Sequence, residues 1–376
     1  MKIKLLLVVN VDWFFISHRL PIAIAAIKKG YDVHLITSIT SHYNLLIRSG
    51  LHVHPIHMSR NNMSFFSNII IFFKLFFTIK KIKPDIVHLI TIKPIVIGGL
   101  VIRLLNIKSV VISITGLGYI FLEKKFFSNI KKFFLGKLYK IVTNHKNLFV
   151  IVQNLDDLKF IKAINKSLKK KVILIKGSGV DLKIFKKRKI PNGAPIIMMA
   201  SRFLIDKGVF EFYEASKKLH HLGRFVLVGE PDKYNSSSIS TGLLDSWVKS
   251  NFVENWGPQK NMHNILSKAT IVVLPSYREG LPKVLIEAAA CGRAIITTNV
   301  PGCKESILNG KTGLLVKVKD SESLASKIQY LLTNKKVCLR MGLAGRAFAE
   351  KSFNIQTVVN THLHAYKNLI RNSKKK

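Results

Sequence analysis

The chain has 376 residues, of which 48% are hydrophobic, enough to fill the cores of two globular domains. Its 60 basic and 20 acidic residues give a net charge of +40, which favours an anionic partner such as nucleic acid, anionic lipid or a phosphorylated substrate. The three widely spaced cysteines exclude a disulfide framework, and without a secretory signal or an 18-residue uncharged apolar segment we expect a cytoplasmic protein with no membrane-spanning helix.

The first part of the chain alternates short apolar runs with helical patterns. A first strand is predicted at 4–10 and a helix at 17–29, which ends at Gly30. Further strands are predicted at 32–37, 51–56, 85–90, 110–115, 148–153 and 172–175. This alternation indicates a doubly wound parallel sheet, which we assign to residues 1–188. Within residues 1–190 there are 33 basic and only 7 acidic residues, so this is the more basic half.

Two stretches of the first domain differ from an ordinary core. Residues 65–83 are apolar around most of a helical circumference, with lysines gathered at one end. Residues 126–140 place Phe126, Ile130, Phe133, Phe134 and Leu138 on one stripe and lysines such as Lys131 and Lys132 mostly elsewhere. Basic amphipathic helices with aromatic residues are typical of a membrane interface, and this interpretation is favoured for the second stretch. The alternative is a pair of core helices with solvated lysines.

Charge, proline and glycine in residues 186–195 indicate a linker to a second domain. Beyond it the alternation restarts, with strands predicted at 196–200, 225–228, 270–274, 294–298 and 313–316. We therefore expect a second parallel sheet within residues 195–352. Residues 353–376 are expected to form a helix that crosses back to the first domain, followed by a basic tail.

Two glutamates surround the start of a predicted helix after the 270–274 strand. Glu279 lies in the loop before the helix, and Glu287 lies inside it. The first-turn N–H groups of Leu281, Lys283 and Val284 would suit a diphosphate, and a carboxylate suits vicinal hydroxyls. The pattern is that of a sugar-nucleotide site. The alternative is ordinary complementation of the helix dipole by acidic residues.

The surrounding text, E-G-L-P-K-V-L-I-E-A-A-A-C-G, strongly resembles the E-x7-E block of retaining glycosyltransferases of the GT-B fold, family 4. The resemblance implies two Rossmann-like domains facing across a cleft, with the donor on the second and the acceptor on the first. It also implies that Glu279 contacts the hydroxyls of the transferred sugar and Glu287 the ribose. The donor-binding loop would comprise Gly280, Leu281, Pro282 and Lys283.

The segment S-R-x3-D-K-G, which follows the 196–200 strand, resembles the donor-phosphate site of the same family. Arg202 can bind two phosphate oxygens and Lys207 can place a point charge beside them, so with Glu279 they are our catalytic candidates. The alternative is a pair of surface cations. Gly257 would allow close approach of the donor to the backbone. The chain contains no D-x-D metal clamp, so we expect no metal and no cofactor, with the leaving-group charge stabilised by these cations.

The loop at 10–21 contains S-H-R-L-P and resembles the capsule and O-antigen subgroup of the family. The resemblance implies that His18 and Arg19 face the acceptor, where Arg19 would meet its diphosphate; otherwise they cap a helix. Asp12 is a candidate general base. Further acceptor candidates are His88, Gly116 and Gly118. Relatives commonly carry a sugar-contacting histidine at the position of Ile90, and this departure puts a catalytic role for His88 in doubt.

These observations together predict a retaining transferase that uses a UDP-sugar, preferably a UDP-N-acetylhexosamine. Its acceptor would be a polyprenyl-diphosphate-linked glycan at the inner face of the cell membrane, in assembly of capsule, O-antigen or another surface polysaccharide. The expected partners are the donor, the lipid-linked acceptor, an anionic membrane surface and other assembly enzymes, but not nucleic acid. Two alternatives are a UDP-N-acetylglucosamine epimerase of similar architecture and a non-enzymatic basic protein that binds nucleic acid or membrane.

Overall fold

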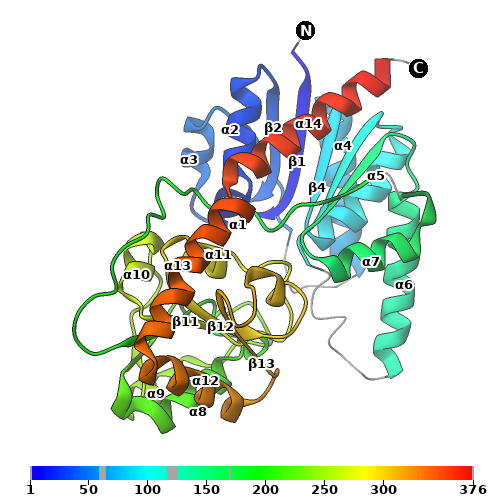
Figure 1. Ribbon diagram of the computed structural model, residues 1–376. Helices are drawn as coiled ribbons and strands as arrows, with labels where there is room; N and C mark the ends of the chain where they lie inside the picture. The colour runs from blue at the N-terminus through cyan, green and yellow to red at the C-terminus, as the bar shows by residue number, and fades with distance from the viewer. Residues whose placement is uncertain (1, 59–64, 117–125, 169–170, 375–376) are drawn as a thin grey trace. The chain divides into compact units, whose positions relative to one another are not determined.

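The apolar runs of the first part of the chain form one parallel sheet. The structure is a computed structural model that describes residues 2–58, 65–116, 126–168 and 171–374. Contacts divide the chain into two units, Met1–Ser178 with Gln356–Lys376, and Gly179–Ile355 (Figure 1). The first unit carries a seven-stranded sheet in the order β3-β2-β1-β4-β5-β6-β7. Its strands are β1 (Lys4–Val11), β2 (Asp32–Ser38), β3 (His52–Pro55), β4 (Ile86–Ile90), β5 (Ser109–Ile114), β6 (Leu148–Val152) and β7 (Val172–Leu174).

Helices cover this sheet, as expected for a doubly wound fold. They are α1 (Asp12–His18), α2 (Leu20–Lys28), α3 (Tyr43–Arg48), α4 (Phe65–Ile82), a π-helix (Pro94–Gly98) that continues into α5 (Gly99–Leu104), α6 (Phe126–Thr143), α7 (Leu155–Ile164) and α14 (Ile355–Lys374). The helix predicted at 17–29 is in fact two helices. The break falls at Arg19, because Pro21 lies in the first turn of α2 and suits a new helix start.

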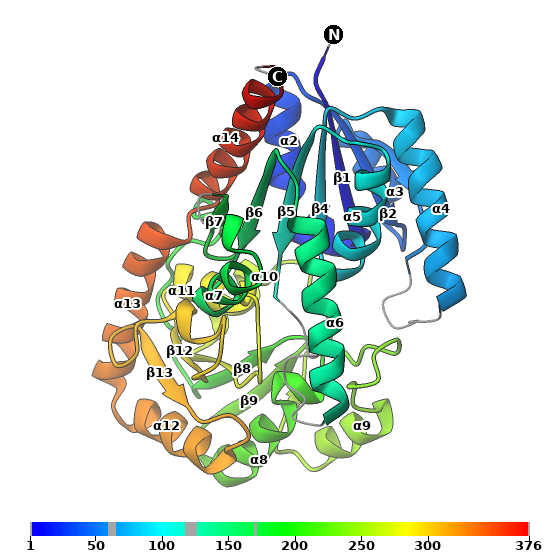
Figure 2. The ribbon, with the colours of Figure 1, turned by 90° about the vertical axis from the view of Figure 1, so that its right-hand side faces the viewer.

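The second unit carries a six-stranded parallel sheet in the order β10-β9-β8-β11-β12-β13. Its strands are β8 (Ile196–Ala200), β9 (Arg224–Val228), β10 (Glu254–Asn255), β11 (Ile271–Leu274), β12 (Ala294–Thr298) and β13 (Gly313–Val316). Its helices are α8 (Val209–Leu219), α9 (Thr241–Lys249), α10 (Met262–Lys268), α11 (Lys283–Ala290), α12 (Ser321–Thr333) and α13 (Lys335–Ser352) (Figure 2). Short 3-10 turns lie between some of these elements. The two parallel sheets confirm the predicted fold class.

Residues 186–195, expected to be a linker, belong to the second unit, as do residues 179–185 before them. Buried Arg293 donates from Nη2 to the carbonyl oxygens of Arg188 (2.6 Å) and Lys189 (3.2 Å). Arg346 donates to the carbonyl oxygen of Phe185 (2.6 Å). Two guanidinium groups thus fix a segment whose sequence has the composition of a flexible connector.

The last helix, α14, packs within the first unit from Gln356 onward. Tyr366 on this helix shares a hydrogen bond of 2.7 Å with Nδ1 of His88 on β4. Asn147, just before β6, donates to the carbonyl oxygen of Leu369 (2.9 Å). The helix is therefore held by polar contacts as well as by the buried side chains along its inner face.

Candidate active site

The candidate donor residues gather at one edge of the second sheet. All its strands are parallel, so the loops that follow β8, β9, β10, β11 and β12 emerge at the same edge. The chain leaves β8 for β9 on one side and returns to β11 on the other, which makes the β8/β11 junction a topological switch point. Ligands of open α/β sheets bind at such points, beyond the carboxyl ends of the strands. Lys207 follows β8 and Glu279 follows β11, so they flank this junction.

Lys207 and Glu279 form an ion pair across the switch point. Glu279 Oε1 also accepts a hydrogen bond of 2.8 Å from Ser276 Oγ, a partner that sequence reasoning missed. The side chains of Lys207 and Glu279 are 18% and 13% exposed, so water screens this pair only partly. The structure thus joins two residues that lie 72 positions apart in the chain.

Arg202 lies in the same loop as Lys207 and pairs with Asp232, which follows β9. The backbone N–H of Asp232 donates to Ser238 Oγ (2.8 Å), which fixes the loop that carries the carboxylate. Asp232 was missed in the sequence. Its position in a G-E-P-D segment directly after a predicted strand is the signal that could have found it. The carboxylate holds the Arg202 guanidinium at the sheet edge.

The loop after β12 presses against the backbone of Glu279. Glu279 donates its N–H to the carbonyl oxygen of Pro301 (3.0 Å). Gly302 has a φ of +82°, and a Cβ there would lie 2.5 Å from the carbonyl oxygen of Glu279, so only glycine fits. The position of Glu279 is therefore set by two loops as well as by its ion pair.

Helix α11 begins beside Glu279, and no side chain caps its first turn among the described residues. Gly280, Leu281 and Pro282 form the buried approach to it. Glu287, inside the helix, is 5% exposed, and its Oε1 forms an ion pair with Lys283 Nζ at 3.1 Å. Burial raises the pKa of the Glu287 carboxyl, and the Lys283 ammonium acts in the opposite direction. An uncapped helix start beside cations is suited to a bound anion.

Gly257 follows β10 at the same edge, with a φ of +63°. Its carbonyl oxygen accepts a hydrogen bond from Gly229 N (2.9 Å), and no described atom lies within 4 Å of a Cβ built on it. Because Gly257 has no side chain, the space beside its backbone is open. This is the arrangement expected of a position that a ligand approaches closely.

Asp12, the candidate general base of the first unit, is fully buried at the start of α1. Its carboxylate accepts hydrogen bonds from Thr40 Oγ1 (2.7 Å), from the backbone N–H of Thr40 (2.8 Å) and Trp13 (2.8 Å), and from Ser41 and His42. Burial raises the pKa of Asp12, but the hydrogen bonds from Thr40, His42 and Trp13 outweigh it and hold the pKa below its usual value. Within this unit the carboxylate ties α1 to the loop after β2, which leaves it poorly suited to act as a base.

Arg19 and His88, expected at the acceptor, lie inside the first unit. Arg19 is 1% exposed, and burial lowers the pKa of its guanidinium to about 10. His88 lies in the middle of β4 rather than at its end, with Nε2 2.7 Å from Ser113 Oγ and Nδ1 bonded to Tyr366. Helix α14 covers both side chains, a position that the local motif did not reveal. Acceptor contact by Arg19 or His88 stays a prediction.

The other acceptor candidates fall at the carboxyl edge of the first sheet or outside the described residues. His18 ends α1, and its ring stacks on Phe14 at 4.2 Å between centroids. Gly116 follows β5 with a φ of +121°. Gly118 lies outside the described residues. At the same edge, Thr91 has an unusual φ of +71° for a β-branched residue, and its Oγ1 donates to Asn10 Oδ1 (2.9 Å). Sequence reasoning missed Thr91, whose only signal is its place after a strand.

The arrangement at the second sheet has the chemical groups that a sugar-nucleotide site requires. Two cationic side chains and an uncapped helix start suit a diphosphate, while Glu279 offers carboxylate oxygens to hydroxyl groups.

Cys291, Cys303 and Cys338 are buried, and none of them forms a disulfide. In the portion of the chain that the structure describes, no helix is both long and apolar enough to cross a bilayer.

Comparison with protein families gives two matches that together cover most of the chain. Residues 180–348 match the model described as glycosyl transferases group 1. Residues 4–154 match the model described as glycosyl transferase 4-like. The second of these matches spans β1 to β6 of the first sheet, and the first spans all six strands of the second sheet.

Individual proteins are similar over nearly the whole length. The N,N'-diacetylbacillosaminyl-diphospho-undecaprenol alpha-1,3-N-acetylgalactosaminyltransferase of Campylobacter jejuni is 31% identical over 95% of this chain and 99% of its own. The capsular polysaccharide biosynthesis glycosyltransferase CapM of Staphylococcus aureus is 25% identical over 93% of each chain. Among solved structures, Anabaena Alr3699/HepE in complex with UDP superposes with a TM-score of 0.77, at 16% identity, over 98% of this chain and 100% of that one.

Proposed function

The chain belongs to the family 4 glycosyltransferases of the GT-B fold, and from that premise we propose that it moves a sugar from a UDP-sugar, with retention of configuration, to a polyprenyl-diphosphate-linked glycan. It is a hexosyl or N-acetylhexosaminyl transferase of polysaccharide biosynthesis. The Lys207–Glu279 pair at the switch point is the main support for the proposal. It places a cation suited to phosphate beside a carboxylate suited to sugar hydroxyls.

The donor is proposed to bind at the carboxyl edge of the second sheet. Its diphosphate would lie at the start of α11, with Arg202 and Lys207 neutralising its charge. Glu279 would then accept hydrogen bonds from the transferred sugar, and Glu287 from the ribose. The solved Anabaena relative holds UDP, which supports the choice of nucleotide.

The acceptor class follows from the Campylobacter relative, whose name specifies an undecaprenol-diphosphate-linked acceptor and transfer of N-acetylgalactosamine. We infer a polyprenyl-diphosphate-linked acceptor and an N-acetylhexosamine donor for this chain. The location proposed for the enzyme is the cytoplasmic face of the cell membrane, where such an acceptor would be presented. At the first sheet, His18 and Gly116 remain candidates for acceptor contact.

In the proposed reaction a bond forms between an acceptor hydroxyl oxygen and the anomeric carbon, and the bond from that carbon to the β-phosphate oxygen of UDP breaks. The hydroxyl proton passes to the departing phosphate on the same face of the sugar, which preserves the configuration. Arg202, Lys207 and the amide groups at the start of α11 stabilise the charge that develops on UDP. These groups supply that stabilisation without a metal, so we propose a metal-independent transferase.

The proposal is tested with a panel of UDP- and GDP-sugars and a lipid-linked acceptor, with and without EDTA. We expect transfer from one UDP-sugar, undiminished by EDTA, and a loss of about 100-fold or more in kcat for Glu279→Gln and for Arg202→Ala. Glu350→Gln, which changes an exposed glutamate on α13, is the matched control and should leave kcat unchanged.

Wild-type turnover by Glu279→Gln would contradict the assignment of the site. Loss of activity with EDTA that Mg²⁺ restores would contradict the metal-independent mechanism. Release of an epimerised sugar in the absence of acceptor would favour the epimerase alternative.

A further inference from the structure

Helix α4 (Phe65–Ile82) has two apolar faces, of which the described residues cover only one. At about 100° per residue, Ile71, Leu75, Ile79 and Ile82 lie on one side of the helix. These four are at most 6% exposed and belong to the core of the first unit. The core of the first unit therefore covers this side of the helix, with Phe72 and Phe76 partly buried against it as well.

The opposite side carries an equally continuous row of large apolar side chains. We name this row the outer stripe; it consists of Phe66 (77% exposed), Ile69 (36%), Ile70 (56%), Phe73 (52%) and Phe77 (63%). With the same angular increment the five lie within an arc of about 100°. Single exposed apolar residues are normal, but a contiguous row of five marks an interaction surface.

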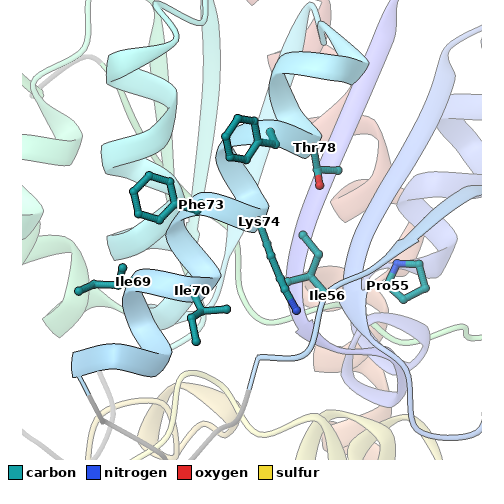
Figure 3. A pocket seen from close by; sticks show the side chains of 8 residues that line it. Pro55, Ile56, Ile69, Ile70, Phe73, Lys74 and Thr78 are labelled. Atoms are coloured by element: carbon teal, nitrogen blue, oxygen red, sulfur yellow. The ribbon is translucent and has the colours of Figure 1, made fainter.

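The outer stripe borders a hollow at the end of β3. This hollow has a volume of about 530 Å³ and is lined by Ile69, Ile70, Phe73, Phe77, Lys74 and Thr78 of α4 together with Pro55 and Ile56 (Figure 3). In Figure 3 the Lys74 side chain extends toward Ile56. An open, mainly apolar hollow beside a lysine can receive part of a chain of methylene groups while the ammonium meets an anion.

All the charged residues of α4 are lysines. Lys74 and Lys81 lie along one border of the stripe, and Lys80 lies near its carboxyl-terminal end. Helix α4 contains no acidic residue. Lysines at the border of an apolar face extend their stems along it and keep their ammonium groups at the polar boundary. This combination fits an anionic lipid surface, which supplies apolar chains and negative headgroups at once.

We propose that the outer stripe docks the protein on an anionic bilayer, with α4 lying in the plane of the interface. Phe66, Phe73 and Phe77 enter the boundary between headgroups and acyl chains, and Lys74, Lys80 and Lys81 contact the headgroup phosphates. The inference rests on the membrane location in the proposed function and adds the residues and the lipid chemistry. The sequence-based preference for residues 126–140 stays a prediction, since the side chains of 126–134 lie outside the described residues.

The test is co-sedimentation of the full chain with vesicles of phosphatidylcholine alone or with 30% phosphatidylglycerol, a composition chosen for the experiment. We expect binding to the anionic vesicles, weaker at high salt, and at least about a tenfold loss of affinity in F73S/F77S. The matched control is L339S/L343S, which removes two exposed leucines at the same spacing from α13 of the second unit. Circular dichroism should show unchanged folding for both variants, because all four side chains are at least 46% exposed.

Equal vesicle binding by F73S/F77S and the wild type would overturn the proposal. A concentration-dependent dimer in sedimentation velocity that F73S/F77S abolishes would overturn it too, since a second copy of the chain would then cover the outer stripe. Transfer to a water-soluble acceptor with a short prenyl tail separates this surface from the chemistry: F73S/F77S should retain it fully. Vesicle binding that depends on α4 in a protein without transferase activity would refute only the proposed function.

Discussion

At the scale of single residues, the ion pair of Lys207 and Glu279 joins the two groups proposed to bind the donor, a cation for the phosphates and a carboxylate for the sugar hydroxyls. Each side chain neutralises the other, in a place that water reaches only partly. Removing one partner leaves the other as a poorly solvated charge, which is costly, whereas removing both leaves no such charge. Stability and ligand binding should therefore respond differently to single and double substitutions.

For Lys207→Met we expect a loss of about 1–3 kcal/mol in unfolding free energy and at least about a tenfold weaker affinity for UDP. The double variant Lys207→Met/Glu279→Gln should regain most of the stability but none of the affinity. Denaturant unfolding and titration calorimetry measure the two quantities.

Lys218→Met is the control, because Lys218 pairs with Glu322 in solvent, with 44% and 75% of the two side chains exposed. We expect a change in stability of no more than about 0.5 kcal/mol there. Recovery of UDP affinity in the double variant would show that Lys207 does not contact the nucleotide.

At the scale of elements, α14 is held to the first sheet by a buried polar cluster. The groups that face one another are Arg19, His88, His362 and Tyr366, with the ring of Tyr31 packed edge-on against Tyr366 at 6.2 Å. Burial, and then the charge of Arg19, lower the pKa of His362 to about 3. Burial, the neighbouring His362 and Arg19 also hold the pKa of His88 well below its usual value. No carboxylate is among these groups, so further protonation has no counter-charge.

The lowered pKa values of His362 and His88 predict that the first unit loses stability in mild acid. A histidine whose pKa is lower when folded takes up its proton more readily when unfolded, so its contribution is complete above about pH 6.5 and declines as pH falls toward the folded pKa. For His362 the loss between pH 7 and pH 5 is about 2 kcal/mol. The variant His362→Phe should lose correspondingly less stability over that range in urea unfolding.

The control is His364→Phe on the exposed side of the same helix, which should keep the pH dependence of the wild type. A His362→Phe variant with an unchanged pH dependence would show that the acid sensitivity arises elsewhere.

At the scale of the whole molecule, the net charge of +40 acts on folding and on binding in opposite ways. Repulsion among 60 basic residues destabilises the folded chain, and dissolved salt screens it. The same charge attracts anionic lipid, and salt screens that attraction as well. A rise in ionic strength should therefore increase the stability of the folded chain and lower its affinity for anionic lipid.

We expect the thermal midpoint to rise by a few degrees between about 50 and 500 mM NaCl, while affinity for anionic vesicles falls. Scanning calorimetry and vesicle co-sedimentation under matched conditions provide the comparison, with phosphatidylcholine vesicles as the uncharged control. A midpoint that falls with salt would mean that ion pairs outweigh the repulsion.

The sequence by itself determined the fold class and the family, because alternating apolar runs and helices are local patterns and the E-x7-E text is contiguous. It also located Arg202, Lys207 and Glu279 in loops after strands, since parallel strands send those loops to one edge. These properties belong to short segments and do not depend on which other segments pack against them.

Only the tertiary structure decided which side chains meet. The partners of Glu279 and Arg202 depend on the order of strands in the sheet, and the burial of Arg19 and His88 depends on a helix more than 250 residues further along the chain. Residues 186–195 resemble a linker until Arg293 binds their carbonyl groups. The sequence of helix α4 is apolar on nearly all sides, and only packing against the first unit shows which face the described residues leave exposed.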